Sequence, residues 1–211
     1  MNYKRPVIPL NFLLRVLLLI TGLFFLALGV ALSARSGLGV SPSASVAYVL
    51  SEIFPFSMGM FTALLNCLYI LIQLLILRRD FHPARLLQLA VVFLFGYFTD
   101  FTLGLVNGLS VSSYPLQLLL SLFACAVMGF GVFLEVRANV IVMASEGALS
   151  LIASRTKKEF GTVKIINDCL LIVLAAAVSL SVFHRIEGIR EGTVIAAVFV
   201  GLFAQDRKNV V

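Results

Sequence analysis

Long apolar runs constrain this chain more than any other feature. Runs close to twenty residues recur along its length, and about 20 apolar residues let an α-helix cross roughly 30 Å of hydrocarbon. The alternation of apolar and polar residues that is typical of barrel strands does not occur. Of the 211 residues, 61% are hydrophobic and 12% are charged, and soluble domains carry about twice that charged fraction. The sequence therefore predicts an all-α, polytopic membrane protein.

Six transmembrane helices can be drawn from these runs. We expect them at residues 16–34, 58–77, 86–106, 115–136, 161–183 and 192–205, the last being the shortest. Two shorter segments, 42–54 and 143–154, have too few residues to cross. Each is either a re-entrant helix buried in protein, an amphipathic helix at the membrane surface, or a loop. Residues 1–211 are expected to form a single membrane domain.

Basic residues predict the orientation of these spans. With a cytoplasmic N-terminus and six crossings, only Arg35, Arg185 and Arg190 fall outside, and every other Lys and Arg falls inside. This bias predicts a multi-pass cell-membrane protein with both termini in the cytoplasm. The net charge of +6 then reflects topology and contacts with the lipid bilayer. No nucleic-acid partner is expected.

The second half of the chain repeats the first after a shift of about 102 residues. The long, short, long, long order recurs, which indicates a duplication with repeat 1 at 11–106 and repeat 2 at 115–206. Three spans per repeat is an odd number, so repeat 2 is expected to lie inverted, as in many secondary transporters. Matched positions are 29 and 131, 35 and 137, 37 and 139, 43 and 145, 59 and 161, 66 and 168, 67 and 169, and, at a shift of 105, 96 and 201.

The stretch "RSGLGVSP" breaks the first repeat between its long and short segments. Gly37 and Gly39 allow a turn that an ordinary helix residue disfavours. Ser41 before Pro42 is typical of a helix start. In transporters with inverted repeats, such interruptions mark the binding site. We therefore predict that residues 37–41 contribute to binding a small solute.

The stretch "RANVIVMA" breaks the second repeat at the matching place. Asn139 takes the position of a glycine and tolerates the same left-handed backbone. Ser145 and Glu146 are expected to start the short helix that follows. The two breaks, related by a two-fold axis in the membrane, would aim both helix starts at one central site.

Polar residues inside the spans mark a second set of candidates, because ionisable groups are costly in hydrocarbon. Asp168 lies within the fifth span, one helical turn after Lys164, so the two can pair. Asn66 occupies the repeat position that matches Asp168. These three side chains either bind a substrate or cation near the middle of the membrane, or form a structural ion pair and interhelical hydrogen bonds.

Three further charged residues are weaker candidates for substrate binding. Asp100 follows "GYFT" in the third span, where it either serves a site or reaches the outer surface. Arg35 and Arg137 occupy matching repeat positions. They either clamp an anion together or anchor their spans to lipid headgroups.

Catalysis of the soluble type finds no support in the sequence. His82 and His184 lie in loops, and no HExxH motif, nucleophile elbow or phosphate-binding glycine loop is present. Cys67, Cys125 and Cys169 lie inside apolar runs, which predicts neither disulfides nor a zinc site. We expect no catalytic residue, no metal and no cofactor, and hence no enzyme.

Several stretches resemble the YczE/YyaS/YitT family of bacterial membrane proteins. These are "GVALSARSGLGVSP", "RANV", "EGALSLIASRTKKEFGTVKIINDCLLIV" and "EGTVIAAVFVGLF", within residues 22–206. The resemblance implies a bacterial inner-membrane location, with a basic residue and an aspartate at Lys164 and Asp168. The family places an aromatic–acid pair after the Ser-Pro, but this chain has Ser43 and Ala44 there, and only Glu146 keeps an acid. The family has no defined biochemical activity.

We expect this chain to transport a small solute, by import or export, through a site between the two repeats. One alternative is a substrate-binding membrane subunit that needs a partner ATPase, which suits the chain's size. A second is a membrane regulator or scaffold that transports nothing. A homodimer is compatible with each of these functions.

Overall fold

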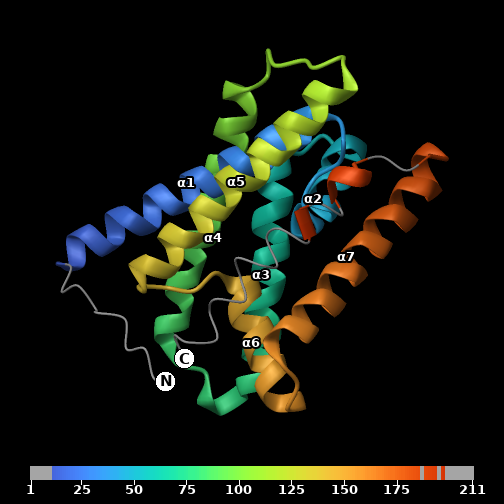
Figure 1. The fold of residues 1–211 in the computed structure, drawn as a ribbon. Helices are drawn as coiled ribbons and strands as arrows, with labels where there is room; N and C mark the ends of the chain where they lie inside the picture. Colours follow the sequence, from blue (N-terminus) through green and yellow to red (C-terminus); the bar gives the residue numbers. More distant parts are fainter. Residues whose placement is uncertain (1–10, 186–187, 194–195, 198–211) are drawn as a thin grey trace, which may run out of the picture.

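The computed structural model describes residues 11–185, 188–193 and 196–197 (Figure 1). This part of the chain is helical and holds no strand. Five of its helices are long and apolar enough to cross a membrane, which makes the chain a multi-pass helical membrane protein. They are α1 (Phe12–Ser36), α3 (Met58–Leu77), α4 (Leu87–Leu105), α5 (Tyr114–Ala138) and α7 (Phe160–Phe183).

Two short helices lie between these spans, close to where the sequence predicts them. They are α2 (Pro42–Ile53) and α6 (Ala144–Thr156). Two 3-10 turns, η1 (Arg78–Asp80) and η2 (Pro83–Leu86), connect α3 to α4. The predicted sixth span at 192–205 falls mostly outside the described residues and stays a prediction.

Backbone conformation explains where the long helices stop. Gly37 ends α1 with φ 73°, in the left-handed region, and Asn139 ends α5 with φ 46°. Ser41 is the N-cap of α2 and Pro42 its first residue. Helix α6 begins at Ala144, one residue before the expected Ser145, which places Glu146 in its first turn.

Helix boundaries recur along the chain with a spacing of 102 residues. Helices α1 and α5 begin at 12 and 114 and end at 36 and 138. The starts of α2 and α6, at 42 and 144, differ by the same amount, as do those of α3 and α7, at 58 and 160. The residues matched at this spacing within the described helices therefore sit at equivalent places, whereas position 201, matched to 96, lies outside the described residues.

Helices α1 and α5 cross each other at very short range and run in opposite directions (Figure 1). A Cβ atom added to Gly22 would lie 2.9 Å from the carbonyl oxygen of Gly131, and one added to Gly131 would lie 2.8 Å from that of Gly22. A Cβ on Gly29 would lie 2.9 Å from the carbonyl oxygen of Ala124. Only glycine permits this approach, and small residues of this kind are typical of membrane helix interfaces.

Each short helix packs against one long helix of its own half of the chain and one of the other half. Helix α2 lies against α3 and α7, and α6 lies against α7 and α3. Six of the twelve residues of α2 are buried, and Ser45 and Val49 are fully so. This packing disfavours a surface helix for α2 and favours a helix enclosed by protein.

Crowding at the α1–α5 crossing makes a direct prediction. Gly131→Ala should lower the free energy of unfolding by about 1–3 kcal/mol, because the added methyl group would overlap the backbone of α1. Gly104→Ala is the matched control, because nothing lies within 4 Å of a Cβ atom there, and removing a helical glycine should raise stability slightly. Thermal unfolding in detergent measures both changes. Equal stability of the two variants would contradict the close crossing.

Candidate functional site

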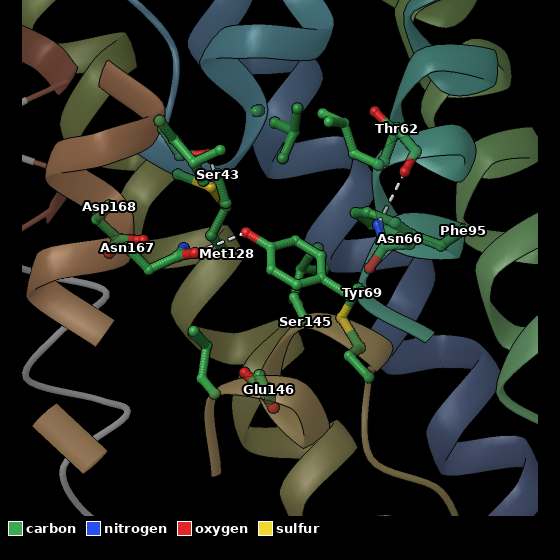
Figure 2. Close-up of a pocket in the computed structure, with 18 of the residues that line it drawn as sticks. Ser43, Thr62, Asn66, Tyr69, Phe95, Met128, Ser145, Glu146, Asn167 and Asp168 are labelled. Carbon is green, nitrogen blue, oxygen red and sulfur yellow. Dashed lines mark hydrogen bonds between the residues drawn. The ribbon is translucent and has the colours of Figure 1, made fainter. Parts of the chain in front are cut away.

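A cavity of about 100 Å³ lies where helices α1 to α7 converge (Figure 2). Each helix contributes at least one lining residue. Figure 2 shows the ring of Tyr69 inside it, between Asn66 on α3 and Asn167 on α7. Ser145 and Glu146, at the start of α6, line the same space.

Most of the lining residues form pairs that are 102 positions apart. The cavity therefore lies where equivalent parts of the two halves face each other. The pairs are Leu26 and Met128, Val30 and Val132, Ser41 and Met143, Ser43 and Ser145, Ala44 and Glu146, Thr62 and Lys164, Leu65 and Asn167, Asn66 and Asp168, and Tyr69 and Leu171.

The cavity has one largely apolar wall and one polar wall. Helices α1 and α5 supply only apolar side chains, and α4 adds Phe95 and Thr99. The polar side chains come from α3, from α7 and from the starts of α2 and α6. A ligand that fits both walls needs an apolar part and a polar part.

Three polar residues of α3 share the face toward the cavity, because they follow the helical spacing i, i+4, i+7. They are Thr62, Asn66 and Tyr69. The side-chain amide of Asn66 donates to the carbonyl oxygen of Thr62 at 2.9 Å. Its Oδ1 atom is buried and accepts no hydrogen bond from a described residue. The Tyr69 hydroxyl donates to Oδ1 of Asn167 at 2.8 Å (Figure 2).

On α7, Lys164 and Asp168 form the ion pair that their spacing predicts. The Lys164 ammonium lies 3.3 Å from Oδ2 of Asp168, and the two side chains are 17% and 14% exposed. Oδ1 of Asp168 is buried and receives no hydrogen bond from the described part of the chain. The ion pair therefore engages only Oδ2 of Asp168, and Oδ1 is left to accept from another donor.

Six of the residues predicted to bind a solute come together in this cavity. They are Ser41, Asn66, Ser145, Glu146, Lys164 and Asp168. Ser43, which was not among the predicted residues, lines it as well. Gly37, Gly39 and Asn139 do not line it. Their left-handed backbones instead turn the chain from a long helix into the short helix that does.

The irregular backbone before each short helix is hydrogen-bonded by the opposite half of the chain. The amide of Val40 donates to the carbonyl oxygen of Gly188 at 2.9 Å. Before α6, the side-chain amide of Gln88 donates to the carbonyl oxygen of Val142 at 3.1 Å, and that of Gln73 donates to the carbonyl oxygen of Ala144, the first residue of α6, at 2.9 Å. The bonds at Val40 and Val142 satisfy backbone groups outside the helices, which non-helical backbone at membrane depth requires.

The structure does not bring Arg35 and Arg137 together, so they form no joint anion clamp. Because α1 and α5 are antiparallel, the two arginines lie at opposite ends of the helix pair. Gly22 meets Gly131, which places Arg137 roughly 28 Å from Arg35 along α1. The Arg35 guanidinium donates to Asn107, and Arg137 is exposed.

Asp100 also lies outside the cavity and has a structural role. One carboxylate oxygen accepts from the Ser57 hydroxyl at 2.6 Å, and the other accepts from the amide of Gly59 at 2.7 Å. These contacts cap the N-terminus of α3, where a negative charge is favourable.

Sequence reasoning missed Thr62, Tyr69, Thr99 and Asn167. Thr62 and Tyr69 share a helical face with Asn66, so helical spacing around that predicted residue could have found them. Asn167 is the sequence neighbour of Asp168, and that adjacency was the available signal. Thr99 sits on a different helix, α4, and its position depends on how α4 packs.

The capping role of Asp100 predicts a loss of stability. Asp100→Ala should lower the free energy of unfolding by about 1–2 kcal/mol, because the first turn of α3 loses an acceptor. Asp80→Ala, at an exposed turn, is the control and should change it by less than about 0.5 kcal/mol. Thermal unfolding in detergent compares them. If the Asp100→Ala protein is as stable as the control variant, the capping role of Asp100 is contradicted.

Comparison with known proteins identifies a family but no activity. No curated protein and no solved structure matches the chain. The family described as "Family of unknown function (DUF6198)" matches residues 13–206, which is most of the chain. This chain is therefore a member of that family of unknown function.

Proposed function

We propose that this chain is a small-solute transporter or exporter of the bacterial inner membrane, with its solute site in the cavity described above. The observation that carries the proposal is the pairing of the cavity lining at a spacing of 102 residues. We further propose kinship with the YczE/YyaS/YitT family, based on "GLGVSP" and residues 161–168.

The proposal treats residues 11–106 and 115–206 as inverted repeats, with the sixth span at 192–205 completing the second. Its support is that contacts occur in corresponding pairs. Helix α1 crosses α5 antiparallel, and the contact of Gly22 with Gly131 has its counterpart, 102 residues away, in the contact of Ala124 with Gly29. In the same way, the packing of α2 on α7 corresponds to that of α6 on α3. A two-fold axis in the membrane plane through the cavity relates all of these contacts.

Inverted repeats supply a physical route to transport. If the two halves hold slightly different conformations, exchanging them gives a second state of similar energy that opens to the other side. A solute bound on the axis then meets both sides in turn. A protein with a site at one surface has no such route.

The charged side chains of the proposed site all come from one half of the chain, and these groups can contact a polar solute. The three charged side chains in the described lining are Glu146, Lys164 and Asp168, all in the second half. Their mates are Ala44, Thr62 and Asn66. We propose that Asp168, Lys164 and Asn66 contact the solute, with Ser43, Ser145 and Glu146 completing the pocket.

Topology tests the inverted arrangement. Cys67, Cys125 and Cys169 are replaced first, and one cysteine is then introduced at Gly108 or at Arg155, both of them exposed. A membrane-impermeant maleimide should label Gly108→Cys from outside intact cells. It should label Arg155→Cys only after the cells are opened. Labelling of both from the same side contradicts inverted repeats.

Alternating access tests transport without knowledge of the solute. Single cysteines at Ser43 and at Ser145 lie in the cavity on paired positions. In membrane vesicles of known orientation, each should react with a small impermeant thiol reagent added from either side, because the cavity opens to both in turn. Gly108→Cys, as the control, should react from one side only.

A regulator or scaffold predicts a different result in the same experiment. Its cavity stays closed or opens to one side, so neither cavity cysteine would be labelled from both sides. That outcome contradicts the transporter proposal.

A further inference from the structure

We propose that Tyr69 and Asn167 form a hydrogen-bonded barrier across the cavity, which a solute must open to pass from the start of one short helix to the start of the other. This inference rests on the proposed function, because such a barrier matters only where something crosses the cavity. Three features of the cavity support it: the position of the Tyr69 ring, the hydrogen bond that holds the ring, and the residues at the exchanged repeat positions.

The ring of Tyr69 stands inside the cavity and divides it. Figure 2 shows Ser43, at the start of α2, on one side of the ring, and Ser145 and Glu146, at the start of α6, on the other side. All four of these residues line the cavity. A solute that moves between the start of α2 and the start of α6 therefore has to displace the ring.

The hydrogen bond to Asn167 holds the ring in this position. The Tyr69 hydroxyl on α3 donates to Oδ1 of Asn167 on α7 at 2.8 Å. Helices α3 and α7 make no extended contact with each other, and each of them packs instead against α2 and α6. The bond therefore reaches across the cavity from one long helix to the other, and breaking it frees the ring to move.

The repeat places a different pair of side chains at the exchanged positions. A shift of 102 residues carries Tyr69 to Leu171, and the same shift carries Leu65 to Asn167. Both leucines line the cavity. They pack against one apolar cluster from α2 and α7, formed by Val46, Val49 and Ala175. The side of the cavity toward α2 is thus held by apolar packing alone at these positions, whereas the barrier toward α6 has a directional bond.

A single hydrogen bond suits a barrier that both closes and opens. The net effect of one such bond on an equilibrium is about 2- to 10-fold, so the closed position is favoured without being locked. A solute that carries a hydrogen-bond donor can also take the place of the Tyr69 hydroxyl on Asn167. Arrival of the solute then releases the ring that blocks its path.

A purely structural tie between α3 and α7 predicts a different behaviour. Loss of such a tie loosens the helices as a whole and exposes the cavity on both sides of the Tyr69 ring alike. Loss of a barrier changes only the passage past the ring. Reactions that require this passage therefore distinguish the two roles.

Side-specific labelling in membrane vesicles of known orientation tests the barrier. Single cysteines at Ser43 and at Ser145, in the protein without its native cysteines, lie on opposite sides of the ring. In the proposed topology, the first is reached directly from the outer face of the membrane and the second from the inner face. Labelling of either cysteine by a small impermeant thiol reagent from the opposite face is a crossing reaction. Tyr69→Phe keeps the ring and removes the hydroxyl, and it should speed both crossing reactions by about 2- to 10-fold. Labelling of each cysteine from its own face should not rise.

A second variant on the other helix removes the same bond. Asn167→Leu deletes the acceptor and should give the same pattern as Tyr69→Phe, and the double variant should exceed neither single variant, because only one bond is lost. Tyr97→Phe is the matched control, since its ring on α4 is 64% exposed and does not line the cavity. All of its rates should equal those of the parent. Thermal unfolding in detergent identifies a variant that fails to fold, and the other variant then decides.

The outcomes separate the barrier from the proposed function. Faster crossing reactions in the folded variants, without a rise from the own face, support the barrier. Unchanged crossing rates overturn it, and transport still stands where the parent is labelled from both faces. An equal rise of all rates overturns the barrier in favour of a structural tie. Crossing reactions that occur only in the variants support the barrier and contradict transport, and their absence from every protein overturns both.

Discussion

The close antiparallel crossing of α1 and α5 is the contact on which the rest of the structure depends. Gly22, Gly29 and Gly131 let the two backbones touch, so the helices form a closely packed pair along one side of the molecule (Figure 1). Since the pair is antiparallel, the chain leaves it at opposite ends and starts α2 and α6 at opposite ends. The cavity is the space that these two short helices and the helices after them enclose against the crossed pair.

Polar groups inside such a molecule have to find partners within the protein, because lipid offers none. The breaks before α2 and α6 show how the chain does this. Gln73 is fully buried, and its side-chain amide donates to Oε1 of Gln88 and to the carbonyl oxygen of Ala144. Its own Oε1 atom accepts from the Arg85 guanidinium at 2.8 Å. Each break is therefore held by residues from the other half, which joins the two halves at the places where helical hydrogen bonding stops.

Against this background, the unfilled oxygens of Asn66 and Asp168 stand out. Elsewhere the chain provides donors for irregular backbone even at the cost of burying glutamine side chains. At the cavity it leaves one acceptor on α3 and one on α7 without a donor from the described residues. The lining residues match in position at a spacing of 102 but not in chemistry, since the three charged residues Glu146, Lys164 and Asp168 correspond to the neutral Ala44, Thr62 and Asn66.

Much of the fold followed from local features of the sequence. The span at Met58–Leu77 has the predicted ends, and the left-handed residues at Gly37 and Asn139 stop their helices as expected. These features depend on a few neighbouring residues, because glycine and asparagine tolerate that backbone whatever surrounds them. The candidate site was predicted in part, through Asn66, Lys164 and Asp168, because ionisable and amide groups are rare in apolar helices and are easily seen.

The sequence by itself determined the class of protein and most of the helix ends, through its composition and its turn residues, and the spacing of matched residues predicted a duplication. Only the tertiary structure decided which polar residues meet. Asp100 and Asp168 look alike within their apolar spans, yet one caps α3 and the other lines the cavity. Arg35 and Arg137 match in the repeat, yet the antiparallel crossing separates them. The physical reason is that lipid and protein core are both apolar, so a membrane helix carries little sequence record of which face turns inward.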